Sequence, residues 1–396
     1  MTDFVRLGDI ASSSYGLTAS ASDDPTGHRF LRITDIVNGI PGSYESVPFV
    51  DVDESSATKY RLNRGDIVVA RTGATVGATH WFRGWYEPVL YASYLVRFIP
   101  NPSIADSRFV GYALQSPAWD DYVYANAFAK SAQPNMSAGV MADHTFRLPP
   151  LHEQKRIGQL LGALDDKIVA NQKAILQLDK LRHALWQRNL QAGAFPKPLS
   201  SLASFVNGGA FTKNATGTGR VVVRIAELTG GIGGSTVRNV LDVPDNQVVR
   251  NGDLLFSWSG TLMVKRWPLG EAIVNQHIFK VVPDPDFPAV FLDCAIDQQL
   301  DYFRMIAAGK ATTMGHIKRS DLDAEVEIPV QIREDDLQLS SSLWDTAVSL
   351  EKENVSLAKT RDELLPLLMS GKISVEEAEQ EATAAGANNA SEENEA

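Results

Sequence analysis

Residues 148–190 carry an apolar seam that is too long for a helix buried within one small domain. Apolar side chains recur along it in steps of three or four residues, at Ile157, Leu161, Leu164, Ile168, Ile175, Leu178 and Leu185, with polar residues in the seam only at Asn171 and Arg182. This spacing is typical of a coiled coil. About 40 residues at roughly 1.5 Å each form a helix about 60 Å long. Because such a helix has no core of its own, it must pack against a partner.

A second apolar seam in the same chain can supply that partner. It lies near the C-terminus, at Leu343, Ala347, Leu350, Leu357 and Leu364, and it aligns with the first seam without a gap at an offset of 179 residues. Asn171 interrupts the first seam, and we expect it to pair with Asn354 and fix the register of the two helices. The charged run at residues 165–167 is expected to be a solvated face.

The segments that precede the two helices also repeat. LNRGDIVVARTGA at residues 62–74 is echoed by VVRNGDLLFSWSGT at 248–261, and RFLRITDIVNGI at 29–40 by VVVRIAELTGGI at 221–232. Short apolar runs bounded by glycine-containing turns indicate buried strands. We therefore predict an α+β fold in which two similar mixed α/β domains are separated by two long helices. The helices pack as an antiparallel coiled coil with pseudo-two-fold symmetry.

This pattern divides the chain into five segments. They are a first mixed domain at 1–147, a first long helix at 148–192, a second mixed domain at 193–330, a second long helix at 331–375 and a tail at 376–396. The tail has seven glutamates and no Lys or Arg, which predicts disorder. The net charge of the chain is -11, and it is -4 without the tail. Any binding to nucleic acid must therefore use local basic patches or the charge of a partner.

Several classes of protein are disfavoured by the sequence. No stretch approaches 18 apolar residues and no signal peptide is evident, so we expect a cytoplasmic protein with no membrane contact. The single cysteine, Cys294, excludes a disulfide framework and is expected to be a buried thiol. GxxxxGK[ST], HExxH and Cys/His clusters do not occur in the sequence. We predict a chain that is not an enzyme and has no catalytic residues, metal or cofactor.

Three runs resemble the DNA-specificity subunit of type I restriction-modification systems. They are LPPLHEQKRIGQLLGALDDKIVANQKAILQLDKL, the paired GDI and GDL strands, and the ending ELLPLLMSGKISV, and the resemblance extends to about Val375. It implies two target-recognition domains that bind double-stranded DNA and two bound methyltransferase subunits. Translocase-nuclease subunits would join in the restricting complex. The chain departs from the pattern at residues 328–336, where IPVQIREDD replaces a second PPL element.

Under this resemblance, the two domains would recognise a split and asymmetric target, with half-sites roughly 34 Å apart. Candidate DNA contacts in the first domain are polar residues at strand and loop ends: Arg71, Thr72, His80, Arg83, Lys130, Ser131, Gln133 and Asn135. An arginine fork can bind guanine O6 and N7, and the other side chains suit phosphates. Ordinary solvated loop residues are the alternative interpretation.

The corresponding positions of the second domain supply a different set of side chains. They are Ser257, Trp258, Lys310, Thr312, Thr313, His316 and Lys318. Trp258 and its neighbours replace the arginine of the first domain, which predicts a different base preference, although Trp258 would fit a core equally well. For Gln276 we favour a structural hydrogen bond over a DNA contact.

The base of the first helix supplies candidate contacts to a methyltransferase subunit, at His152, Glu153, Gln154, Arg156 and Ile157. The competing hypothesis is a coiled-coil scaffold whose two domains bind proteins. A self-contained methyltransferase would need a glycine loop for its methyl donor, which the sequence lacks. Sequence-dependent binding to DNA separates the first two hypotheses.

Overall fold

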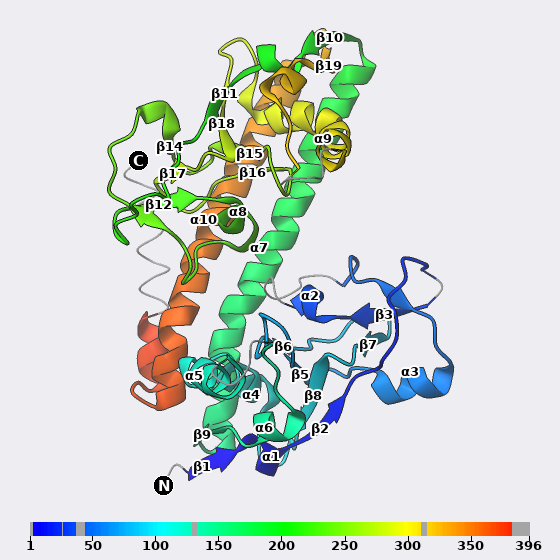
Figure 1. The fold of residues 1–396 in the computed structure, drawn as a ribbon, viewed down its shortest axis with the longest axis vertical. Coiled ribbons are helices and arrows are strands. Elements are labelled where there is room, and N and C mark those ends of the chain that lie inside the picture. The colour runs from blue at the N-terminus through cyan, green and yellow to red at the C-terminus, as the bar shows by residue number, and fades with distance from the viewer. Residues whose placement is uncertain (1–2, 26, 37–43, 129–132, 310–314, 382–396) are drawn as a thin grey trace. The chain divides into compact units, whose positions relative to one another are not determined.

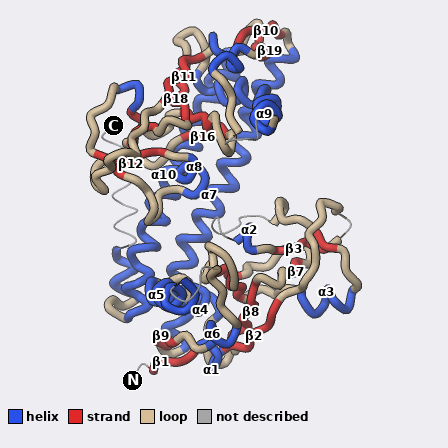
Figure 2. The backbone as a smooth tube through the Cα atoms, in the orientation of Figure 1, coloured by secondary structure: helices blue, strands red, loops and turns tan. Residues whose placement is uncertain are grey.

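The computed structural model describes residues 3–25, 27–36, 44–128, 133–309 and 315–381. The chain forms two compact units: unit 1 comprises residues 1–169 and 356–396, and unit 2 comprises residues 170–355. Two long helices, α7 (Leu151–Gln191) and α10 (Glu334–Ser370), each contribute one part to each unit. Figure 2 shows the strands of the chain before α7 and between α7 and α10. The prediction of two α/β domains joined by two long packed helices is confirmed.

Unit 1 contains three sheets of short strands (Figure 1). The strands are β1 (Asp3–Arg6), β2 (Ala11–Tyr15), β3 (His28–Leu31), β4 (Phe49–Val50), β5 (Ile67–Ala70), β6 (Thr79–Trp81), β7 (Val89–Tyr91), β8 (Leu95–Pro100) and β9 (Thr145–Leu148). The helices before α7 are α1 (Leu7–Ile10), α2 (Ile33–Ile36), α3 (Glu54–Tyr60), α4 (Ser107–Ala113), α5 (Pro117–Val123) and α6 (Ala138–Ala142). The strand orders are β2-β8-β5-β6, β4-β3-β7 and β1-β9.

Unit 2 repeats this arrangement. Its strands are β10 (Ala194–Pro198), β11 (Ala203–Asn207), β12 (Arg220–Val223), β13 (Arg238–Asn239), β14 (Val248–Val249), β15 (Leu254–Ser257), β16 (Met263–Arg266), β17 (Ala272–Val274), β18 (Ile278–Pro283) and β19 (Glu325–Pro329). Its shorter helices are α8 (Ile225–Gly230) and α9 (Leu292–Ala308). The strand orders are β11-β18-β15-β16, β13-β12-β17-β14 and β10-β19.

The two units share the order of the four-stranded sheet and the central pair of the second sheet, to which unit 2 adds β14. β5 in unit 1 and β15 in unit 2 are inner strands of the four-stranded sheets, and all four residues of each strand are buried. In the second sheet, β3 pairs in parallel with β7, and β12 pairs in parallel with β17. The internal duplication predicted from the sequence is thus a duplication of structure as well.

The long helices pack antiparallel within each unit. In unit 2, Asn171 Nδ2 donates to Asn354 Oδ1 at 3.0 Å, and Arg188 Nε donates to Asp336 Oδ2 at 3.2 Å. Residue numbers rise along α7 while they fall along α10, which is the antiparallel sense. The predicted pairing of Asn171 with Asn354 is confirmed. α7 begins just after Pro149 and Pro150, because proline is favoured at a helix start and disfavoured inside a helix.

Each unit has its own hydrophobic core. In unit 1, Ile157 and Leu161 of α7 join Leu364 and Leu368 of α10 and side chains of the four-stranded sheet. In unit 2, Trp186 of α7 is fully buried among side chains of the sheet and α9. Both ends of the apolar seam are therefore part of a domain core and not only of a helix pair.

The expected solvated face at residues 165–167 is wrong for Asp165. This residue is 2% exposed, and its carboxylate accepts a hydrogen bond from Arg361 Nη1 at 2.7 Å and another from Tyr112 at 2.5 Å. Asp166 pairs with Arg83 and Arg108. Sequence periodicity places both aspartates outside the seam, but the domain packs against that side of α7.

The described chain remains folded beyond the end of α10. Gly371 adopts a φ of +71°, which ends the helix, and residues 375–381 form a further helical segment. Ala378 is fully buried in the unit 1 core, and Arg156 pairs with Glu376 and Glu379. The structured part thus includes the first residues of the predicted tail. Within the described residues, helices long enough to cross a membrane are all too polar to do so.

Candidate nucleic-acid interface

In unit 1, the structure brings together two of the predicted groups of DNA contacts. The chain leaves buried strand β5 at Arg71 and passes beside the segment that contains Gln133 and Asn135. Met136 N donates to Arg71 O at 2.8 Å, Gly73 N donates to Pro134 O at 3.0 Å, and Thr72 forms an antiparallel bridge with Asn135. Lys130 and Ser131 lie outside the described residues.

Unit 2 has the same backbone arrangement at the end of β15. Ile317 N donates to Trp258 O at 3.1 Å, Gly260 N donates to Gly315 O at 2.8 Å, and Ser259 forms an antiparallel bridge with His316. Lys310, Thr312 and Thr313 lie outside the described residues. Lys318 is exposed beside this segment, and its backbone N–H donates to Asp321.

A third segment completes each arrangement. In unit 1 the turn between β7 and β8 accepts a backbone hydrogen bond, from Arg71 N to Tyr94 O at 3.0 Å. In unit 2 the turn between β17 and β18 does the same, from Trp258 N to His277 O at 3.3 Å. We call residues 71–73, 92–94 and 133–136 site 1, and residues 258–260, 275–277 and 315–317 site 2.

Sequence reasoning did not assign the turns to these sites. Apolar residues flank each turn on both sides, so each turn resembles part of a continuous strand in the sequence. The signal that could have found it is a pair of polar residues at the same place in both repeats, at 93–94 and at 276–277.

Site 1 displays an arginine packed on an aromatic ring. The Arg71 guanidinium lies 4.8 Å from the centroid of the Tyr15 ring, a cation–π geometry that holds the partly exposed arginine in place. Tyr15 is itself fixed, since its hydroxyl accepts a hydrogen bond from Ala138 N at 3.0 Å. Tyr94 is 61% exposed beside them, and Asn135 is also exposed.

Site 2 displays an indole and two imidazoles instead. The Trp258 ring centroid lies 5.7 Å from that of Phe279 in the core, 5.8 Å from that of His277 and 6.3 Å from that of His316. Trp258 is thus half-buried: one part of its ring packs on the core, and the rest is accessible beside His277 and His316. Ser257 is fully buried and donates to Ser259 O at 3.2 Å, so its predicted DNA contact is replaced by support of the loop.

Two other candidates in unit 1 lie away from site 1. His80 is 4% exposed, and its Nε2 lies 2.6 Å from Tyr44 Oη. Burial, reinforced by the charge of Arg83, lowers the pKa of His80 to about 4, so it is a neutral core residue. Arg83 pairs with Asp166 of α7. Both positions are predicted from the sequence as polar residues at strand and loop ends, but Tyr44 contacts His80 and Asp166 of α7 pairs with Arg83.

The predicted partner contacts at the start of α7 divide into buried and exposed groups. Gln154 is 1% exposed; its side-chain oxygen accepts a hydrogen bond from Asp106 N, and its side-chain nitrogen donates to Ile104 O and Pro149 O. Ile157 is 1% exposed in the core. These two side chains are structural and cannot contact a partner. His152 is exposed, Glu153 is half-buried and paired with Arg147, and Arg156 is half-buried.

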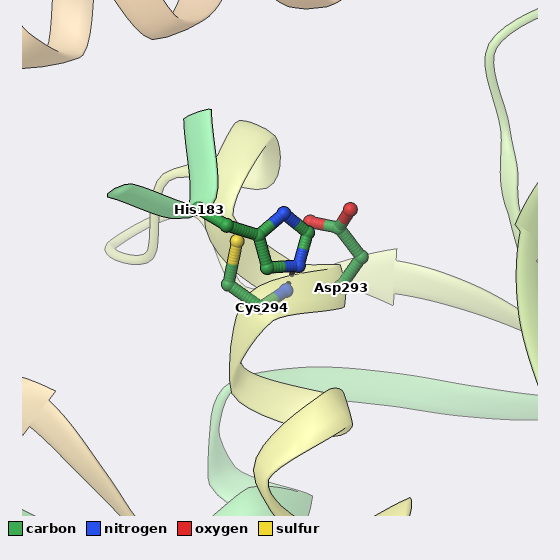
Figure 3. Close-up of side chains that lie close together, drawn as sticks. All are labelled: His183, Asp293 and Cys294. Carbon is green, nitrogen blue, oxygen red and sulfur yellow. Dashed lines mark hydrogen bonds between the residues drawn. The ribbon is translucent and has the colours of Figure 1, made fainter. Parts of the chain in front are cut away.

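A cluster of potential metal ligands lies in unit 2, where His183, Asp293 and Cys294 place one atom each within 4.8 Å of one another (Figure 3). Arg182 is ion-paired with Asp293, and its Nη1 also donates to Cys294 Sγ at 3.3 Å. Burial raises the pKa of Cys294, while a hydrogen bond to Asp297 raises the pKa of His183. A guanidinium therefore supplies the positive charge here, and the cluster attaches α9 to α7.

Comparison with known proteins identifies one family. The family described as "Type I restriction modification DNA specificity domain" matches residues 2–179. The type I restriction enzyme MjaX specificity subunit named in Methanocaldococcus jannaschii is 26% identical over 187 residues, which are 46% of this chain and 43% of that protein. The chain thus aligns with less than half the length of that relative.

The fold is also found among solved structures. The crystal structure of a type I restriction-modification system S subunit from M. genitalium matches with a TM-score of 0.53 and 14% sequence identity. The match covers 93% of this chain and 96% of that one, so it is a likeness of fold. Through the domain matched by residues 2–179, the chain is similar to the type I restriction-modification DNA-specificity family.

Proposed function

We propose that the chain is the DNA-recognition subunit of a type I restriction-modification complex, and that site 1 and site 2 each recognise one half of a bipartite, asymmetric target. The observation that carries the proposal is the common backbone of the two sites. The same backbone hydrogen bonds hold equivalent segments, while Arg71 is exchanged for Trp258 and Asn135 for His316. A shared backbone that carries different side chains suits two sites that bind DNA in the same way but recognise different base sequences.

The side chains of the sites suit base recognition. Arginine binds guanine O6 and N7 through two parallel hydrogen bonds, and asparagine binds adenine N6 and N7 in the same manner. Arg71 and Asn135 come from paired segments of site 1, so they can reach neighbouring base pairs. Site 2 has no arginine at the equivalent position, and Trp258 and His316 would favour a different half-site.

We also propose the organisation of the complex. Residues 1–147 and 193–330 are the target-recognition domains, and residues 148–192 and 331–375 are the helices that carry them. Two adenine methyltransferase subunits would bind near the helix bases, where His152 is exposed, and translocase-nuclease subunits would join for restriction. The starts of the two helices differ in charge, with HEQKR in α7 and EDD in α10. The two methyltransferase subunits would therefore contact unlike surfaces.

The test is to co-express the chain with a type I methyltransferase subunit and map methylated adenines in the genome. One split, asymmetric target is expected. Arg71→Ala should alter one half of that target and Trp258→Ala the other. Arg64→Ala is the matched control, because Arg64 is an exposed arginine in the turn that precedes β5, at the end of the strand opposite to Arg71. Methylation without sequence preference, or a stable complex that does not bind DNA, would instead support the protein-binding scaffold.

A further inference from the structure

We infer that the turns at residues 92–94 and 275–277 are base-recognition elements, in which Tyr94 contacts the half-site of site 1 and Gln276 contacts the half-site of site 2. His277 acts as the positioning residue for Gln276. This inference rests on the proposed function and extends it to residues that had no such role.

Both turns are held tightly by their backbones. Gly16 N donates to Leu95 O at 3.2 Å and Gly208 N donates to Ile278 O at 3.2 Å, so the same bond fixes each turn to the chain after the first strand of its sheet. A Cβ atom on Gly16 would lie 2.2 Å from Ala92 O, and one on Gly208 would lie 2.1 Å from the backbone of unit 2. Only glycine permits this approach. Each turn is therefore a rigid support for side chains that point outward.

The side chains of the turns are exposed beside the paired loops. Tyr94 is 61% exposed although its ring is large and apolar, and its backbone carbonyl is bonded to Arg71. Gln276 is exposed at the tip of the second turn, next to the carbonyl bonded to Trp258. A phenol can contact a thymine methyl group and hydrogen-bond a base edge, and a glutamine amide can bind adenine N6 and N7.

In site 2, a hydrogen-bonded chain orients the glutamine. The amide Nε2 of Gln276 lies 3.2 Å from His277 Nε2, and His277 Nδ1 lies 3.0 Å from Ser259 Oγ. Because the amide nitrogen donates, His277 Nε2 must accept, which places the imidazole proton on Nδ1, facing Ser259. His277 thus links the turn to the paired loop and limits the directions in which the Gln276 amide can point.

The experiment uses the complex with the methyltransferase subunit and compares methylation at the mapped target with methylation at sites that differ by one base pair. Tyr94→Ala should lower this discrimination about 10-fold at one position of the half-site that Arg71→Ala alters. Gln276→Ala should do the same in the half-site that Trp258→Ala alters. Tyr86→Ala, an exposed tyrosine between β6 and β7, should leave discrimination unchanged.

The positioning role of His277 has its own readout. His277→Ala should lower discrimination at the same base pair as Gln276→Ala. His277→Gln, which retains a hydrogen-bond acceptor, should restore that discrimination, and the melting temperature of the protein should stay unchanged. If Arg71→Ala and Trp258→Ala alter the target while Tyr94→Ala and Gln276→Ala do not, this inference is overturned and the proposed function stands. If all four variants leave the target unchanged, the proposed function fails with it.

Discussion

Arg266 fastens the sheet of unit 2 to both long helices. Its side chain is 6% exposed, and Nη1 and Nη2 donate to the two carboxylate oxygens of Asp179 on α7 at 2.8 Å each. Nη2 also donates to Glu351 Oε1 on α10 at 2.9 Å, and the guanidinium lies 4.7 Å from the centroid of the Trp344 ring. Burial works against the charge of Asp179, but the contacts with Arg266 and Arg182 outweigh it and hold its pKa below the usual range.

Replacing Arg266 with methionine should destabilise unit 2 strongly. The variant would keep most of the packing on Trp344 but leave the half-buried carboxylates of Asp179 and Glu351 without Arg266, and only Asp179 would retain another arginine, Arg182. Removing one partner of a fully buried ion pair costs about 3 to 5 kcal/mol, so the partial exposure of the two carboxylates places the expected loss at the lower end of that range. The triple variant Arg266→Met, Asp179→Asn, Glu351→Gln also removes the two negative charges and should recover most of that loss.

The assay is hydrogen–deuterium exchange in increasing urea, followed on peptides that cover β15 and β16, since these report on unit 2 alone. Arg250→Met is the control, because Arg250 is exposed and its pairing with Asp245 is at the surface. We expect that control to match the unaltered chain. A loss below about 1 kcal/mol for Arg266→Met would refute the reasoning, and so would a triple variant as unstable as the single one.

Three further perturbations test other parts of the fold. Burial keeps His80 neutral with a pKa of about 4, so protonation of the unfolded chain at this residue should reduce the free energy of unfolding by about 3 kcal/mol between pH 6.5 and pH 4. Burial lowers the pKa of His144 to about 4 as well, so urea titrations of His80→Gln should show a smaller pH slope than the unaltered chain, and an unchanged slope would contradict the argument. Changing Asn171 alone to leucine should lower the free energy of unfolding in urea by about 1 to 2 kcal/mol. Changing Asn171 and Asn354 together to leucine should restore or exceed the original free energy of unfolding, and equal losses in the two variants would contradict a paired role. Gly208→Ala should lower the free energy of unfolding by more than about 2 kcal/mol in thermal melts, because the new Cβ atom would lie 2.1 Å from a backbone atom. Gly234→Ala should have little effect in the same melts, because its Cβ atom would have no other atom within 4 Å.

The sequence predicted the parts of the fold that depend on periodicity. The seams of α7 and α10, their antiparallel sense and the Asn171 pairing follow from residue spacing and from the alignment of the two repeats. The repeated GDI and GDL runs likewise predicted the buried strands β5 and β15. These features are local patterns, or comparisons of two segments, and need no knowledge of which surfaces meet.

The residues that were misplaced depend on packing between elements distant in sequence. Asp165 lies outside the seam by spacing, yet Tyr112 and Arg361 reach it from α4 and α10. His80 is predicted from the sequence as a polar residue at a strand end, yet it is buried, and Tyr44 contacts it. A polar residue in a regular pattern is compatible with both solvent and a buried partner, and only the tertiary contacts distinguish the two.

The two sites and the helix attachments tolerate change very differently. Tyr94 and Gln276 are exposed side chains at the rim of a sheet, where substitutions usually change stability by less than about 0.5 kcal/mol. Exchanging Arg266 would cost several times more, because both long helices depend on it. The exposed side chains of the two sites can therefore differ between the two units while the glycines that hold the turns, Gly16 and Gly208, remain the same, since no other residue fits them. Under the proposed function, the recognised sequence could change through these side chains while the backbone that supports them stays unchanged.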